Sequence, residues 1–184
     1  MMGKVRGALF NALHSIDSFD IKRANVLDVF SGSGSIGLEA LSRGAKRATF
    51  VDASSDCIRT CLSNAEACGF KDRALGVCAR AEDFLADPVR FGIQNSFHLV
   101  CLTPPYEEVN YPDLLALIGK CSMIAENCVF VIEYPKEMKS LPYIINGRLF
   151  GIRNRRFGRT MLAMYAFSPS QDFPFHPDEF SSIT

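Results

Sequence analysis

The chain has 184 residues, of which 48% are hydrophobic and 22% are charged, and its formal net charge is zero. This length and composition predict one soluble globular domain, and the zero net charge excludes a general electrostatic attraction to nucleic acid. No apolar run approaches the roughly 20 residues that a membrane-spanning helix needs, and no signal peptide is visible. The seven cysteines are odd in number and form no CxxC motif, so we expect reduced thiols and no metal site.

Helical and strand-like spacings of apolar residues alternate along the chain, which predicts an α/β fold. We expect helices over residues 4–14, 35–42, 54–68, 81–85 and 111–121. We expect strands over residues 26–30, 47–51, 74–79, 97–102, 128–133, 148–153 and 160–167. Because helices separate the first five strands, these should form a parallel sheet, whereas the last two should form an antiparallel hairpin. The domain should span residues 1–167 and be followed by a mobile or loosely docked tail over residues 168–184, which shows no period.

A glycine-rich turn follows the first expected strand and opens a helix. Gly32, Gly34 and Gly37 have the GxGxxG spacing of nucleotide-binding turns, in which free backbone N–H groups and the helix dipole meet a ligand. We expect Gly32 and Gly34 to let a ligand approach the backbone where a β-carbon would clash. By itself the spacing also fits a structural turn or a nicotinamide dinucleotide site.

Two acidic residues narrow the choice of cofactor. Asp28 lies inside the strand, where a carboxylate would repel a pyrophosphate and favour a cation such as the amino group of S-adenosylmethionine, through water or the backbone. Asp52 ends the second strand, where it can accept both hydroxyls of a ribose or, alternatively, cap a helix. The turn over residues 80–83 should read the adenine edge through a backbone N–H and a carboxylate.

A second motif, Thr103-Pro104-Pro105-Tyr106, follows the fourth strand. The prolines fix two φ angles and remove two donors, so the neighbouring carbonyls point in set directions at a crevice where ligands bind in such sheets. The Thr103 hydroxyl and the Pro104 carbonyl could accept the two hydrogens of an exocyclic amino group and turn its lone pair toward a methyl donor. Tyr106 could stack on the base. The motif therefore predicts methyl transfer to nitrogen.

Taken together, these segments resemble the RsmD-type methyltransferases, which methylate the exocyclic N2 of one guanine in 16S, small-subunit ribosomal RNA. The similarity is carried by residues 5–11 (VRGALFN), 26–45 (VLDVFSGSGSIGLEALSRGA) and 156–160 (RFGRT), with the strand that follows. The resemblance implies a Rossmann-like, S-adenosylmethionine-dependent methyltransferase whose seven-stranded, mostly parallel sheet ends in an antiparallel hairpin.

The resemblance also assigns roles to residues of this chain. The residues expected to bind the cofactor are Asp28, Phe30, Ser31, Gly32, Ser33, Gly34, Gly37, Asp52, Ala53, Ala81 and Glu82. The residues expected to hold the guanine are Thr103, Pro104, Pro105 and Tyr106.

Three departures from the family pattern matter. The family usually has Asp or Asn where this chain has Thr103, and a hydroxyl should hold an amine less firmly. Arg80 stands where a small polar or acidic residue is common, which favours Glu82 as the adenine partner. The chain also begins inside the family's leading segment, so we expect the usual amino-terminal RNA-contacting extension to be missing through truncation or divergence.

Ribosomal RNA or a small-subunit assembly intermediate is the expected partner of a monomer. The candidates for its phosphates are Lys4, Arg6, Arg155, Arg156 and Arg159. We expect a cytoplasmic location, or an organelle matrix or stroma after removal of a targeting peptide, and no membrane association.

Three other functions remain open. One is a different amino methyltransferase, acting on adenine N6 in DNA or RNA or on protein glutamine. The second is a non-catalytic, cofactor-binding assembly factor, for which Thr103 is the main argument. The third is a nicotinamide-dependent oxidoreductase.

Overall fold

The computed structural model describes residues 3–105 and 110–181. The α-helices are α1 (Gly3–His14), α2 (Ser35–Ser42), α3 (Ser55–Ala67), α4 (Ala81–Ala86) and α5 (Tyr111–Ile118). The strands are β1 (Asn25–Val29), β2 (Arg47–Asp52), β3 (Ala74–Cys78), β4 (Phe97–Leu102), β5 (Ile124–Pro135), β6 (Ile144–Ile145), β7 (Leu149–Phe157) and β8 (Thr160–Phe167). The short 3₁₀ helices are η1 (Ile21–Arg23), η2 (Lys71–Arg73), η3 (Pro88–Phe91), η4 (Lys136–Met138) and η5 (Pro177–Glu179).

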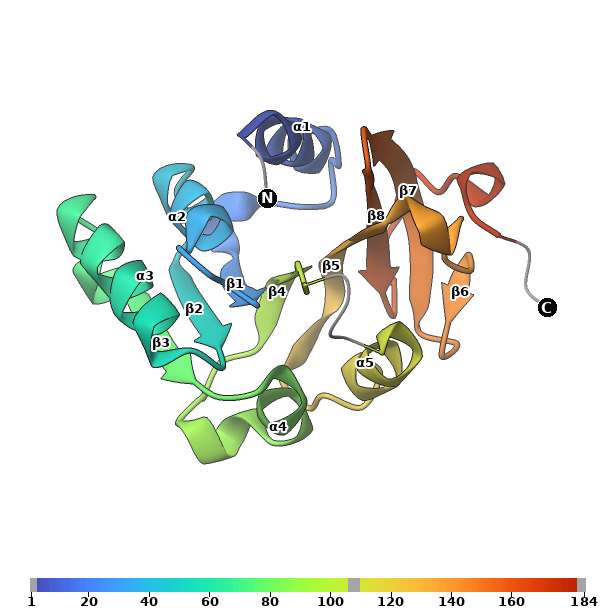
Figure 1. Cartoon of the computed structure of the whole chain (residues 1–184). Helices are drawn as coiled ribbons and strands as arrows, with labels where there is room; N and C mark the ends of the chain where they lie inside the picture. The colour runs from blue at the N-terminus through green and yellow to red at the C-terminus, as the bar shows by residue number, and fades with distance from the viewer. Residues whose placement is uncertain (1–2, 106–109, 182–184) are drawn as a thin grey trace.

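All eight described strands form one sheet in the order β3-β2-β1-β4-β5-β8-β7-β6. Strands β1 to β5 pair in parallel, and β8, β7 and β6 continue the sheet antiparallel. Helices α1, α2 and α3 cover one face, and α4 and α5 cover the other (Figure 1). The fold class expected from the sequence, a mostly parallel α/β sheet with a terminal antiparallel hairpin, is confirmed.

The two faces of the sheet each carry an apolar layer, because the central strands are buried on both sides. One layer joins α1 and α2 to the sheet through Leu9 and Leu41, which are fully buried. The other joins α4 and α5 to it through Phe84 and Ile118. These helices cover both faces of the parallel part of the sheet, and the carboxyl ends of its strands are where open α/β sheets bind ligands.

The structure has one strand more than the seven expected. Strand β6 is two residues long and turns into β7 at Asn146 and Gly147, which have φ values of 52° and 65°. An Asn-Gly pair favours this tight hairpin turn, so the sequence did contain a signal for it. The same turn explains why α5 ends at Ile118 rather than at residue 121. Asn146 Nδ2 donates to the Leu115 carbonyl over 2.7 Å, and Arg148 donates to the Gly119 carbonyl over 3.2 Å, so tertiary contacts cap the helix.

The segment after β8 packs on the sheet as far as the structure describes it. Phe173 and Phe180 are buried, and Ser181 bridges to Pro142. Glu179 accepts the backbone N–H of Asn154 over 2.7 Å, on the edge of β7 that β6 leaves uncovered. Residues 168–181 thus cover a sheet edge; the division into a domain over residues 1–167 and a mobile or loosely docked tail over residues 168–184 stays a prediction.

None of the helices within the described residues is both long and apolar enough to span a bilayer.

Candidate active site

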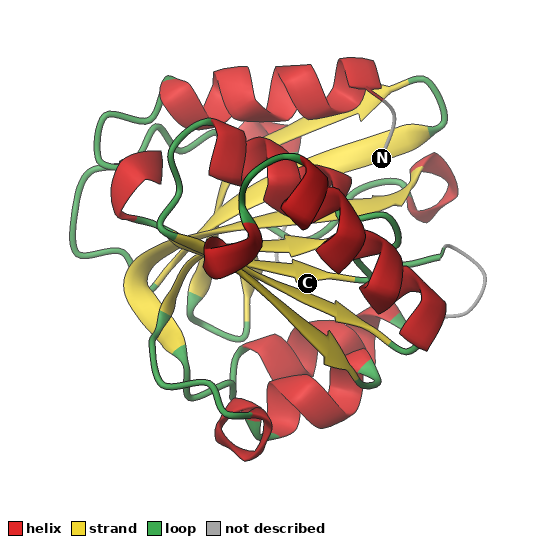
Figure 2. Cartoon of the chain, turned by 90° about the vertical axis from the view of Figure 1, so that its left-hand side faces the viewer, coloured by secondary structure: helices red, strands yellow, loops and turns green. Residues whose placement is uncertain are grey.

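The expected cofactor and substrate motifs lie side by side at one edge of the sheet. Val29, the last residue of β1, pairs with Val51 of β2 on one side and with Leu102 of β4 on the other. The glycine turn after β1, Asp52 at the end of β2 and Thr103 after β4 therefore share the edge to which the parallel strands point (Figure 2). This is the crevice in which open α/β sheets bind ligands.

Asp28 supports the glycine turn from inside β1. Its side chain is 1% exposed, and Oδ2 accepts the N–H of Gly37 in α2 over 2.9 Å. Its Oδ1 has no hydrogen-bond partner among the described residues. Burial raises the pKa of the Asp28 carboxyl from 3.8 to about 7, although the Gly37 hydrogen bond lowers it. The carboxyl therefore acts on the turn through the backbone and does not lie open to solvent.

The three glycines serve different purposes. Gly32 has a φ of 53°, and a β-carbon there would meet open space, so its backbone is accessible to a ligand. Gly34 has a φ of 78°, and a β-carbon would lie 3.0 Å from Cys61 Sγ; at Gly37 it would lie 2.4 Å from the ring of Phe50. Gly34 and Gly37 thus make room for the protein's own core, and the approach of a ligand to the Gly34 backbone stays a prediction.

Asp52 joins the end of β2 to the glycine turn. Its Oδ2 accepts the N–H of Gly32 and its Oδ1 accepts the N–H of Ser54, both over 2.9 Å. The Ser54 hydroxyl in turn caps α3. Each carboxylate oxygen can accept a further hydrogen bond, so the capping contact and ribose binding are compatible.

Two side chains of α3 hold the other side of the turn, and the sequence reasoning missed both roles. The thiol of Cys61 donates to the Gly32 carbonyl over 3.2 Å, and Asn64 Nδ2 donates to the Ser33 carbonyl over 3.0 Å. Burial raises the pKa of the Cys61 thiol to about 11, so it remains a donor at neutral pH. Their spacing of three places them on one side of α3, the only signal that the sequence offered.

The expected adenine-side residues follow β3. The backbone N–H of Ala79 donates to the Asp52 carbonyl over 3.0 Å, which brings this turn to the same edge. Ala81 is buried, and Glu82, in the first turn of α4, lies with Oε2 3.5 Å from Arg80 Nε. Arg80 thus partly neutralises the carboxylate that we expected to face adenine.

The proline motif packs against the end of β1. The N–H of Thr103 donates to the Val29 carbonyl over 3.4 Å, and its hydroxyl donates to the Phe30 carbonyl over 3.5 Å. Phe30 itself is in the left-handed region, with a φ of 60°. Pro104 is buried and Pro105 exposed. Because the Thr103 hydroxyl uses its hydrogen on Phe30, its lone pairs stay free to accept; Tyr106 lies outside the described residues.

Comparison with known proteins decides the family. A family profile described as "Conserved hypothetical protein 95" matches residues 1–166. The chain belongs to this family. It is 34% identical over 162 residues to YlbH of Bacillus subtilis, provisionally named an rRNA methyltransferase, with 88% of this chain and 84% of YlbH covered.

Two further relatives agree. The chain is 29% identical over 135 residues to ribosomal RNA small subunit methyltransferase D of Haemophilus influenzae, with 73% of this chain and 66% of that protein covered. A solved structure from Escherichia coli, provisionally described as the methyltransferase yhhF, has a TM-score of 0.78 at 26% identity and covers 91% of this chain and 87% of its own. The predicted resemblance is thereby confirmed: this protein is an RsmD-type methyltransferase.

The turn of this methyltransferase has the features that S-adenosylmethionine needs. Gly32 leaves its backbone open to a ligand, and the Asp52 carboxylate lies within hydrogen-bond distance of it. Asp28 carries a buried oxygen without a partner, close beneath the same turn. No group of His, Cys, Asp or Glu within the described residues could hold a metal ion.

The cations expected to bind RNA differ in their partners. Arg6 lies with Nε 3.5 Å from Glu39, and Arg155 lies with Nη2 3.0 Å from Glu179. Arg156 Nε donates to the Gly158 carbonyl over 2.9 Å. Lys4 and Arg159 are exposed. The hairpin of the methyltransferase thus presents two exposed arginines, at 156 and 159, for which no ion pair is formed within the described part of the chain.

Proposed function

We propose that this methyltransferase transfers a methyl group from S-adenosylmethionine to the exocyclic N2 of a guanine in small-subunit ribosomal RNA. The observation that carries the proposal is the contact between the two motifs. Thr103 binds Val29 and Phe30, the residues from which the glycine turn starts. A methyl donor bound at the glycine turn and an amine bound at the proline motif would therefore lie next to each other. The rRNA substrate is supported by the relatives named above.

The cofactor roles follow from the hydrogen bonds of the turn. We assign the ribose hydroxyls to Asp52, whose position beside Gly32 is fixed by a 2.9 Å hydrogen bond. The N–H of Ala81 and the carboxylate of Glu82 would read the adenine edge. Asp28 would favour the cationic amino group, acting through the backbone of the turn. When bound, S-adenosylmethionine supplies a methyl group attached to a positively charged sulfur.

The amine is held by acceptors. The Thr103 hydroxyl and the Pro104 carbonyl would each take one hydrogen of the exocyclic amine, which turns its lone pair out of the ring and toward the methyl group. We assign Pro105 and Tyr106 to the base itself. The rate gain arises from positioning, since an amine aligned with the methyl–sulfur bond reacts without losing further rotational freedom.

The RNA would be held through phosphates, with the target guanine turned out of a loop. Lys4, Arg6, Arg155, Arg156 and Arg159 are the proposed contacts. We propose an assembly intermediate of the small subunit as the substrate, and a monomer that acts in the cytoplasm.

Transfer of tritium from labelled S-adenosylmethionine to unmodified small ribosomal subunits tests the proposal, with nucleoside analysis of the product. Label in N2-methylguanosine supports it. Label in N6-methyladenosine would replace guanine by adenine, and cofactor binding without any transfer would favour a non-catalytic assembly factor. Asp52→Ala is the control that should lose cofactor binding and transfer together.

A further inference from the structure

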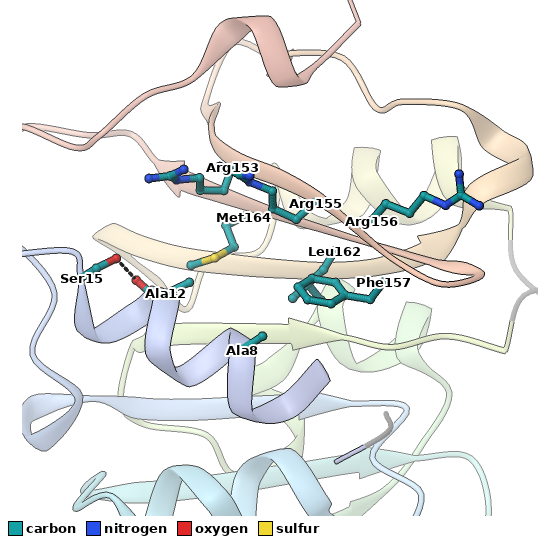
Figure 3. Close-up of a pocket in the computed structure, with 9 residues that line it drawn as sticks. All are labelled: Ala8, Ala12, Ser15, Arg153, Arg155, Arg156, Phe157, Leu162 and Met164. Atoms are coloured by element: carbon teal, nitrogen blue, oxygen red, sulfur yellow. Dashed lines mark hydrogen bonds between the residues drawn. The ribbon is translucent and has the colours of Figure 1, made fainter. Parts of the chain in front are cut away.

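A groove runs between helix α1 and the β7–β8 hairpin, apart from the glycine turn. Figure 3 shows it, and its volume is about 460 Å³. It is lined by Ala8, Ala12, Ser15, Arg153, Arg155, Arg156, Phe157, Leu162 and Met164.

The groove exists because α1 turns small side chains toward the hairpin. Ala8 and Ala12 are four residues apart and therefore share one side of the helix, whereas Leu9 and Leu13 are buried in the core. Leu162 and Met164 of β8 are buried and form an apolar wall. The helix thus stands off the hairpin, and an apolar slot remains between them.

The rim of the groove is cationic. Arg153 and Arg155 share the carboxylate of Glu179, at 3.7 Å and 3.0 Å. Arg156 pairs with no carboxylate among the described residues. Two guanidinium groups, those of Arg153 and Arg155, therefore share one carboxylate, and that of Arg156 points away from Arg153, near the half-buried ring of Phe157 (Figure 3). Such a rim attracts an anion, and the wall beneath it suits a flat apolar group.

One end of the groove opens at the edge of the sheet that carries the candidate active site. Thr160 pairs with Phe157 across the hairpin and with Pro135 at the end of β5. The carboxyl ends of β5 and β4 are neighbours, since Leu102 pairs with Ile132. The groove end at Arg156 and Phe157 therefore shares an edge with the Thr103 turn, and a chain that enters the active site can continue into it.

We propose that this groove binds one unpaired nucleotide of the RNA that flanks the target guanine. The base would lie between α1 and the wall formed by Phe157, Leu162 and Met164, and its phosphate would meet Arg155 and Arg156. Single-stranded RNA has this combination of an anionic backbone and flat bases, and aromatic contacts with bases tolerate different sequences. The inference rests on the proposed function, because it takes RNA as the substrate.

Filling the groove without changing its charge tests the inference. Ala12→Phe places a ring in the slot and should raise KM for small-subunit RNA about tenfold while kcat stays within about twofold. Its matched control is His14→Phe, which adds a ring on an exposed position of the same helix outside the groove. Affinity for S-adenosylmethionine and thermal stability should be equal in the two variants.

Abasic substitution of the RNA then identifies the nucleotide. Removing one base next to the target should raise KM about tenfold for the wild type and for His14→Phe, and should cause no further loss in Ala12→Phe. Arg156→Gln changes an exposed side chain and serves as a second test if Ala12→Phe does not fold. It should raise KM and lower the slope of log KM against log salt by about 1. An unchanged KM in Ala12→Phe or equal effects of abasic sites in both variants would overturn the inference. If the wild type methylates no RNA, the proposed function itself fails.

Discussion

Replacing Asp28 by Asn should change the pH dependence of stability in a defined way. The pKa of this carboxyl is raised from 3.8 to about 7, mainly by burial. Because the folded-state pKa is the higher one, its contribution to stability is fully present below about pH 4 and is lost as the pH rises through about 7. Asn cannot ionise, so Asp28→Asn removes this loss. The free energy of unfolding of the variant, minus that of the wild type, should therefore rise between about pH 4 and pH 8 and then level off.

The size of the effect follows from the same shift. Each pKa unit corresponds to about 1.4 kcal/mol, so the rise should be about 3 kcal/mol between pH 5 and pH 8 and about 4 kcal/mol in total. Asn still offers an oxygen to the Gly37 N–H, but its amide nitrogen replaces the partnerless Oδ1 at a cost of about 1–3 kcal/mol. That cost does not depend on pH, so it shifts the difference in the free energy of unfolding by the same amount at every pH and leaves its slope unchanged.

Urea unfolding of both proteins without cofactor, at half-unit steps from pH 5 to pH 8, measures the difference. A rise of about 3 kcal/mol corresponds to a relative shift of the midpoint of about 1 M or more. All other titrating groups are common to both proteins and cancel in the comparison. Two curves that stay parallel over this range would refute the reasoning, because they would show that Asp28 ionises equally in the folded and unfolded chains.

Four further predictions concern the candidate site. Thr103→Asp should preserve or raise turnover, by up to about fivefold, because a charged acceptor holds the amine more firmly; a lower kcat would refute the proposed amine contact. Asp52→Ala should weaken S-adenosylmethionine binding at least about tenfold in calorimetry, and unchanged affinity would remove the ribose role. Cys61→Val should weaken cofactor binding about tenfold and Cys61→Ser should not, since a hydroxyl can still donate; equal affinities would show that the thiol only fills space. Reversing the charge of Arg155 and Arg156 should weaken RNA binding and flatten its salt dependence by roughly 1 per cation, and an unchanged slope would exclude them from the interface.

The fold could be predicted because its signals are local. The periodicity of apolar residues predicts the alternation of helices and strands up to β5. The hairpin after β5 is predicted by the absence of a helical segment between the last two expected strands. The extent of the strands could not be predicted in the same way. Strand β7 continues to Phe157 although Arg153, Arg155 and Arg156 interrupt its apolar pattern, because β8 pairs with it along that length. Partner strands decide such cases, and propensity alone does not.

The covering of the β7 edge shows a second limit of sequence reasoning. The segment after β8 has no period, yet Phe173 and Phe180 are buried and Glu179 binds both the backbone and the arginines of β7. A single buried aromatic side chain in an irregular segment contributes as much apolar area as in a helix but leaves no repeating pattern. Phe173, Phe180 and Glu179 take their positions from the exposed edge of β7, and this edge exists only once the sheet has folded.

The glycine turn combines both situations. Its own sequence fixes the backbone, but side chains 9 to 31 residues away set its shape: Asp28 binds Gly37, Asp52 and Cys61 bind Gly32, and Asn64 binds Ser33. Because these bonds come from β1, β2 and α3, the turn keeps its form only while those three elements pack together. A GxGxxG spacing without this support leaves a flexible loop that must be ordered by its ligand, at a cost in affinity. The specificity of the turn for a cofactor therefore resides as much in the strand and helix residues that bind its carbonyls and N–H groups as in the glycines.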